Sequence, residues 1–164
     1  MKRFLKLMAI SLVSILCLGC CGCFGFFPNC NEPEKSEEES IREYITRATS
    51  IEVPTDSTMV YLFLAESSGF MHGRDGRYVV FQFEEMPIEW LNENNIIQDD
   101  GTFTNWFNPG FESLQYDLQE ANEEIPQEYL ANFEEEYLCL RAKKSIYFYY
   151  NITTKLLIIL VPGY

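Results

Sequence analysis

The residue types best suited to chemistry gather in one glycine-rich loop, which holds the only histidine of the chain. His72, Arg74, Asp75 and Arg77 fall within a span of six residues. A guanidinium group forks onto a carboxylate or phosphate, and glycine lets the backbone approach a ligand closely. The spacing predicts a ligand-binding loop that is cationic on an otherwise acidic chain. The simpler interpretation is a turn whose arginines pair with nearby acids.

Catalysis by this loop would need His72 as a base beside a nucleophile. Ser67 and Ser68 are near in sequence, but they lack the glycine-flanked elbow of serine hydrolases, and one loop rarely supplies a whole triad. Carboxylate pairs are abundant only because the chain carries 25 acidic residues. We therefore predict a non-enzymatic protein without a metal or other cofactor. The alternative is a small hydrolase that uses the His72 loop.

The cysteines are distributed unevenly, because all but Cys139 lie within the first thirty residues. A disulfide-stabilised fold would spread them through its body, so the globular part is predicted to fold without disulfides. Cys139 is predicted to pack as a small buried hydrophobe. The crowded cysteines have no histidine near them and no folded scaffold, which disfavours a zinc site. They are Cys17, Cys20, Cys21, Cys23 and Cys30.

The first twenty residues have the three zones of an export signal. Met1–Lys6 carries three cations, Leu7–Leu16 is apolar and uncharged, and Gly19 places a small residue before Cys20. This leader resembles the lipobox-type leader of bacterial lipoproteins, and the resemblance extends no further along the chain. It implies that residues 1–19 are removed as a signal peptide. It also implies that the Cys20 thiol carries an acyl-glyceryl group, with chains such as palmitate, that anchors the chain to a membrane.

The leader leaves alternatives open for the anchor. A lipobox prefers leucine three residues before the cysteine, where this chain has Cys17. Cys23 is a second possible acceptor, and Cys21 a weaker one. Residues 7–27 contain no charged residue, so they could instead span a membrane as an uncleaved helix, although their glycines disfavour a helix. Both anchors keep the leading cations inside and place the domain away from the cytoplasm.

The acidic charge restricts the partners. The whole chain has a net charge of −13, and a chain that begins at Cys20 keeps nine of the twelve cations and all 25 acids, which gives −16. Such a surface repels phosphate backbones, so nucleic acid is not expected to bind, and it suits a basic protein partner. Together with the leader, it favours a lipid-anchored binding or accessory protein of the cell envelope. The hydrolase alternative would act in the same compartment.

A tether and a single domain are predicted after the leader. Residues 20–39 contain prolines, scattered polar residues and a run of glutamates, which cannot build a core. Residues 40–164 are enough for one domain. A helix begins near this boundary, because Ser36 and Glu39 have the spacing of a capping box. The residues that share its apolar face are Ile41, Tyr44, Ile45 and Ala48.

Five segments have the β-branched and aromatic composition of strands. Glycines between the first two predict an antiparallel hairpin with a long tip. Leu156–Val161 is a continuous apolar run, which predicts a central strand covered on both faces. We therefore expect an α+β fold in which helices pack on an antiparallel sheet of about five strands. The predicted strands are Thr58–Ala65, Arg77–Glu84, Tyr137–Arg141, Ser145–Tyr150 and Lys155–Val161.

The middle of the chain is predicted to be helical and to be interrupted by turns. Helices are expected at Pro87–Asn94, over Phe111–Ala121 and at Pro126–Glu134. Asn108-Pro109-Gly110 and Asp99-Asp100-Gly101 have the composition of turns. Most aromatic residues in a domain of this size are predicted to be core. Those near the first turn are Trp90, Trp106, Phe107 and Phe111.

Overall fold

The computed structural model of the chain describes residues 35–65, 76–99 and 101–162. One compact unit begins at Ser36 and runs to the end of the chain. The predicted signal peptide, nearly all of the tether and the cysteines of the leader lie outside the described residues, as does the tip of the predicted hairpin.

The unit is built on a six-stranded antiparallel sheet with the strand order β1-β2-β6-β5-β4-β3. The predicted α+β class is confirmed, but the sheet has six strands rather than about five. The additional strand, β3, has two residues, which is too short for an alternating pattern. The strands are β1 (Ser57–Leu64), β2 (Arg77–Phe83), β3 (Ile97–Gln98), β4 (Tyr137–Ala142), β5 (Ile146–Asn151) and β6 (Leu156–Val161).

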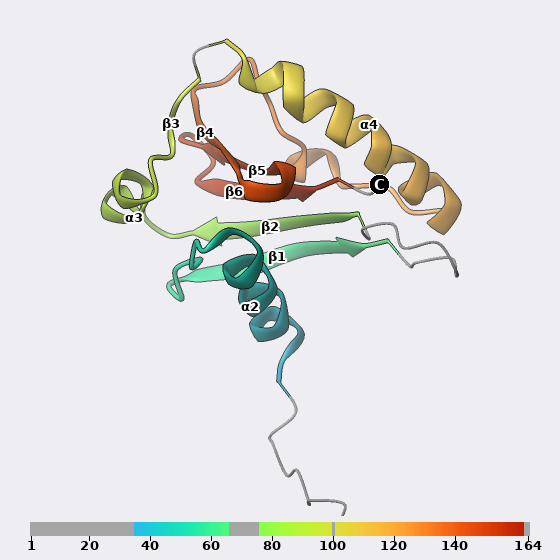
Figure 1. Cartoon of the computed structure of the whole chain (residues 1–164), viewed down its shortest axis with the longest axis horizontal. Coiled ribbons are helices and arrows are strands. Elements are labelled where there is room, and N and C mark those ends of the chain that lie inside the picture. Colours follow the sequence, from blue (N-terminus) through green and yellow to red (C-terminus); the bar gives the residue numbers. More distant parts are fainter. Residues whose placement is uncertain (1–34, 66–75, 100, 163–164) are drawn as a thin grey trace, which may run out of the picture. The chain divides into compact units, whose positions relative to one another are not determined.

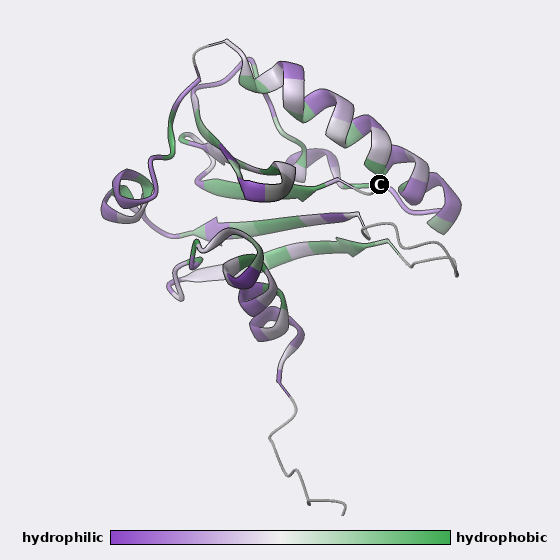
Figure 2. Ribbon diagram, viewed as in Figure 1, coloured by the Kyte–Doolittle hydropathy of each residue, from purple (hydrophilic) through white to green (hydrophobic). Residues whose placement is uncertain are grey.

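The two central strands, β5 and β6, are buried along their whole length. Successive residues of a strand point to opposite faces. Tyr147 and Tyr149 accordingly join the core on one face, and Phe148 and Tyr150 join the core on the other. The prediction that β6 is covered on both faces is confirmed. The strands are mostly coloured hydrophobic in Figure 2, whereas α2 and α4, described next, mix hydrophilic and hydrophobic residues.

Helix α2 (Glu37–Thr49) covers one face of the sheet (Figure 1). Its predicted capping box is confirmed: the Ser36 hydroxyl accepts from the Glu39 N–H at 3.2 Å, and the Glu39 carboxylate accepts from the Ser36 N–H at 3.0 Å. Ile41 and Ile45 are buried against the strands. The run of glutamates from residue 37 therefore belongs to the helix and not to a tether.

Arg42 ties α2 to the segment that leads into β1. Its guanidinium pairs with the Glu38 carboxylate at 2.5 Å. It also donates to the carbonyl oxygens of Pro54 and Ser57, each at 2.7 Å. The side chain is only 13% exposed, and a charge at such a site needs this many partners. These contacts fix the start of β1 relative to the helix.

Helix α4 (Phe103–Ala121) covers the opposite face (Figure 1). The predicted turn at Asn108-Pro109-Gly110 is wrong, because these residues lie inside the helix. Proline has no N–H, so the carbonyl four residues earlier in the helix loses its usual donor. Because Pro109 is exposed, water can bind that carbonyl instead. Gly110 is buried where the helix meets the sheet, and a Cβ there would lie 2.9 Å from Pro162. Close packing therefore places a glycine where local sequence suggests a turn.

The segment between α4 and β4 also differs from the prediction. In place of a helix over Pro126–Glu134 there is one turn of 3-10 helix, Gln127–Tyr129. Tyrosine hydroxyls of the sheet bind its backbone: that of Tyr78 donates to the Tyr129 carbonyl at 2.8 Å, and that of Tyr149 accepts from the Asn132 N–H at 3.2 Å. These bonds replace those of a helix. The short helix predicted from Pro87 is confirmed as α3 (Ile88–Glu93).

Candidate functional site

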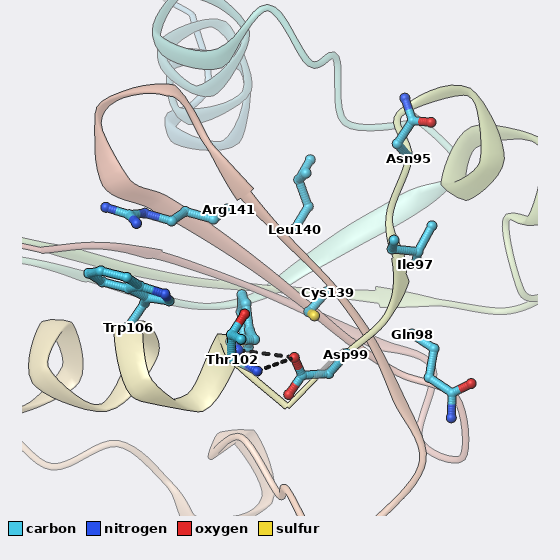
Figure 3. A pocket seen from close by; sticks show the side chains of 10 residues that line it. Asn95, Ile97, Gln98, Asp99, Thr102, Trp106, Cys139, Leu140 and Arg141 are labelled. Carbon is cyan, nitrogen blue, oxygen red and sulfur yellow. Dashed lines mark hydrogen bonds between the residues drawn. The ribbon is translucent and has the colours of Figure 1, made fainter.

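A pocket of about 260 Å³ opens between strands β3 and β4 and the first turn of α4 (Figure 3). The chain segments that form it are far apart in sequence, and antiparallel pairing of Ile97 with Cys139 brings the two strands together. The lining mixes exposed apolar groups with amide, carboxylate and guanidinium groups. It consists of Asn95, Ile97, Gln98, Asp99, Thr102, Phe103, Trp106, Cys139, Leu140 and Arg141.

Asp99 at the base of the pocket is held by hydrogen bonds on both carboxylate oxygens. Oδ1 accepts from the backbone N–H groups of Gly101, Thr102 and Phe103 at 3.0–3.2 Å. Oδ2 accepts from the Tyr137 hydroxyl at 2.7 Å. Gly101 has φ +88°, a backbone conformation that glycine adopts without strain. Asp99 thus binds the backbone that leads into α4, up to its first residue, Phe103; the middle residue of the predicted turn, Asp100, lies outside the described residues.

These contacts determine the protonation of the site. Burial by itself would raise the pKa of Asp99, but the hydrogen bonds from Tyr137 and the three N–H groups together lower it. Burial, followed by the hydrogen bond to Asp99, raises the pKa of Tyr137. Near neutral pH, Asp99 is therefore a carboxylate and Tyr137 a phenol. Since its oxygens already accept four hydrogen bonds, Asp99 is suited to holding the helix and poorly suited to taking a proton from a substrate.

The mouth of the pocket carries an aromatic and cationic pair. The indole of Trp106 is 50% exposed, and the guanidinium carbon of Arg141 lies 4.2 Å from the centre of its ring. One guanidinium nitrogen also donates to the Ser145 hydroxyl at 3.4 Å. Stacking fixes the plane of the guanidinium, and its edge N–H groups can bind an oxyanion in two-point fashion. Ile97, which is 64% exposed, adds an apolar surface to the same pocket.

Of the four residues predicted to bind a ligand, His72, Arg74 and Asp75 lie outside the described residues. The fourth, Arg77, begins β2, and its guanidinium carbon lies 3.6 Å above the ring of Tyr44 on α2. Its buried Nε has no hydrogen-bond partner among residues 35–65, 76–99 and 101–162. A ligand-binding role for this loop stays a prediction.

The predicted buried position of Cys139 is confirmed, with 7% of the residue exposed. The expectation that aromatic residues are mostly core holds for Phe107, which is 2% exposed. Trp106 departs from it. Sequence reasoning did not identify this pocket, because Trp106 and Arg141 meet only through tertiary structure. A usable signal was the arginine at the end of an otherwise apolar strand.

Within residues 35–65, 76–99 and 101–162, no helix has the length and apolar character that a membrane crossing requires. The same residues contain no group of three or more His, Cys, Asp or Glu side chains arranged to hold a metal ion. A scan against protein-family models, a search of curated proteins and a search of solved structures each found no match for this chain.

Proposed function

We propose that this chain is a lipid-anchored cell-envelope protein whose domain binds a ligand or partner outside the cytoplasmic membrane. The leader supports the anchor through its cationic start, its apolar stretch and Cys20 after a small residue. The compact unit starts at Ser36, which leaves about fifteen residues after Cys20 to hold the domain clear of the bilayer. The role is binding or accessory rather than enzymatic.

The stacked pair of Trp106 and Arg141 at the pocket mouth is the observation that carries this proposal. Tryptophan and arginine are among the side chains most enriched at binding hot spots, and half of the surface of Trp106 is accessible to a ligand. Asp99 is occupied by hydrogen bonds from the backbone before α4 and from Tyr137, which supports binding rather than chemistry in the pocket. The ligand that fits is a group with an oxyanion for Arg141 and an apolar part for Ile97 and Trp106.

The distribution of charge supports a basic protein as the larger partner. Residues 78–140 contain 15 acidic residues and no lysine, arginine or histidine. This stretch includes α3, α4 and the segment up to β4. Its negative potential speeds encounters with positively charged proteins and repels acidic ones. Nucleic acid is not a partner in this proposal.

Cross-linking on intact cells tests the proposal, followed by recovery of the full-length chain from the envelope fraction. We expect a partner that is captured by the native chain and lost with Trp106→Ala or Arg141→Lys, because lysine keeps the charge but not the planar stack. Tyr116→Ala is the matched control, since Tyr116 is on the same helix, is 72% exposed and does not line the pocket. Equal capture by all four chains would contradict the proposed site.

A further inference from the structure

The two outer edges of the sheet differ in how well they are protected against pairing with another chain. The β3 edge is only two residues long. The β1 edge is eight residues long, Ser57–Leu64, and contains no charged residue and no proline. Natural sheets usually blunt their edges with short strands, charges, prolines or bulges. Of these devices β1 has only a bulge, where Val60 lacks a partner on β2. Within the described residues β1 is therefore the less protected edge, and Arg42 occupies only the carbonyl of Ser57 at its start (Figure 1).

The backbone of β1 has hydrogen-bonding groups that point away from the sheet. The Ala65 N–H donates to the Gly76 carbonyl at 2.9 Å, so Ala65 bonds toward β2. In an antiparallel ladder, bonding toward the neighbour alternates along the strand. Leu64 and Leu62 therefore direct their N–H and C=O groups outward. Among residues 35–65, 76–99 and 101–162, no other backbone group forms a hydrogen bond to either.

From Met59 to Leu64 the side chains of β1 are apolar or aromatic, and the segment that packs on Tyr61 is acidic. Tyr61 packs on Tyr129 with ring centres 5.7 Å apart. Burial, and then the negative charge of Glu123, raises the pKa of Tyr61. Glu124 and Glu128 are exposed in the same segment. On the opposite face Leu64 is 41% exposed.

We propose that an extended, basic segment of a partner protein adds to β1 as a seventh strand of the sheet. The backbone groups of β1 would bind the segment, its apolar side chains would cover Leu64, and its lysines or arginines would face Glu123 and its neighbours. This inference rests on the proposed binding function and names the chemistry of the partner.

Charge complementarity decides between this occupant and a second copy of the chain. Residues 36–164 contain 8 cations and 23 acids, so the net charge of this part is −15. Two copies joined edge to edge would bring like charges together, whereas a basic segment is attracted. The partner must also supply an extended strand, because the edge offers a row of backbone donors and acceptors rather than a helical groove.

The test uses the full chain in detergent micelles and a phage-displayed library of random ten-residue peptides. We expect the enriched peptides to alternate apolar residues with lysine or arginine. Leu64→Pro removes an outward N–H and leaves the hydrogen bonds between β1 and β2 in place. It should weaken the binding of an enriched peptide by about tenfold. Leu64→Thr keeps the N–H but loses part of the apolar contact, so it should weaken binding less than Leu64→Pro does.

A second measurement leaves the protein unaltered in case Leu64→Pro fails to fold. N-methylation of alternate residues of an enriched peptide should abolish binding for one set of positions and spare the other, which is the signature of strand addition. Glu123→Lys should weaken the binding of the same peptide. Purified chain and peptide do not depend on cellular location, so a failure here is distinct from a failure of the membrane anchor.

Three outcomes would overturn the inference. The first is a library that yields no binder or acidic binders only. The second is equal sensitivity of the bound peptide to N-methylation at both sets of positions. The third is a dimer of the chain that Leu64→Pro dissociates, which would mean that a second copy occupies the edge.

Discussion

Asp99 joins two walls of the pocket at the scale of the residue, because its carboxylate accepts from the N–H of Phe103, the first residue of α4, and from the hydroxyl of Tyr137 on β4. We expect Asp99→Ala to lower the free energy of unfolding by about 1 kcal/mol, because three backbone N–H groups and the Tyr137 hydroxyl lose their acceptor. Asp56→Ala is the control, since Asp56 is exposed and lies in a turn. Denaturant unfolding at neutral pH would measure both. Equal effects of the two substitutions would mean that the hydrogen bonds of Asp99 do not stabilise the fold.

The effect of Asp99 should depend on pH in a defined direction. Its pKa is lowered in the folded protein, so its contribution to stability is fully present above its ordinary pKa. That contribution is lost as the pH falls through the lowered value. The difference in stability between the native chain and Asp99→Ala should therefore narrow in acid. A difference that grows on acidification would contradict the assigned contacts.

Substitution of His72 distinguishes a binding module from a hydrolase. We expect His72→Ala to leave the capture of a partner unchanged, because a binding module does not need a general base. The same substitution would abolish the activity of a hydrolase that used this loop. Partner capture and hydrolysis of ester and peptide substrates would be measured side by side. Hydrolysis by the native chain that disappears with His72→Ala would contradict the non-enzymatic role.

At the scale of elements, alanine substitutions at two neighbouring residues of α4 should change the stability of the protein in opposite directions. Gly110→Ala should destabilise the protein, although alanine favours a helix by about 1 kcal/mol, because the added Cβ would lie 2.9 Å from Pro162 and 3.3 Å from Tyr147. Pro109→Ala should stabilise it, since Pro109 is exposed and proline disrupts a helix interior. Urea unfolding of the two variants measures the signs. A more stable Gly110→Ala variant would show that α4 does not approach the sheet so closely.

The sequence predicted those elements whose cause is local. Periodic apolar residues and the capping box were enough for α2, and alternating or continuous apolar runs were enough for five strands. The first half of α4 was missed because proline and glycine signal a turn, whereas packing against the sheet determines the structure there. The segment after Pro126 was predicted helical because its bonds to Tyr78 and Tyr149 are not visible in local sequence.

The site could be predicted less well than the fold. Residue types alone drew attention to the loop around His72, where charge and glycine are concentrated. The pocket depends instead on Trp106 and Arg141, which are 35 positions apart and meet only when β4 and α4 pack on each other. Apart from the charge of Arg141 at the end of an apolar strand, no sequence pattern marks these two residues. Exposure identifies them once the fold is known.

At the scale of the whole molecule, the compact unit keeps the two proposed binding sites apart. Apolar strands between α2 and α4 form the cores on both faces of the sheet. The pocket at β3 and the less protected edge at β1 lie at opposite margins of that sheet. A ligand at one margin and a strand at the other could therefore bind at the same time. Both would act on the outer side of the membrane if the N-terminus is anchored as proposed.

The intact mass of the chain recovered from the membrane fraction tests the proposed anchor most directly. We expect a mass that lacks residues 1–19 and includes the acyl chains on Cys20. Cys20→Ser should abolish both the cleavage and the acylation. If the substituted chain is still acylated, the acceptor is Cys23 or Cys21. A native chain that keeps residues 1–19, carries no acyl group and stays in the membrane would contradict the lipid anchor and identify an uncleaved helix in its place.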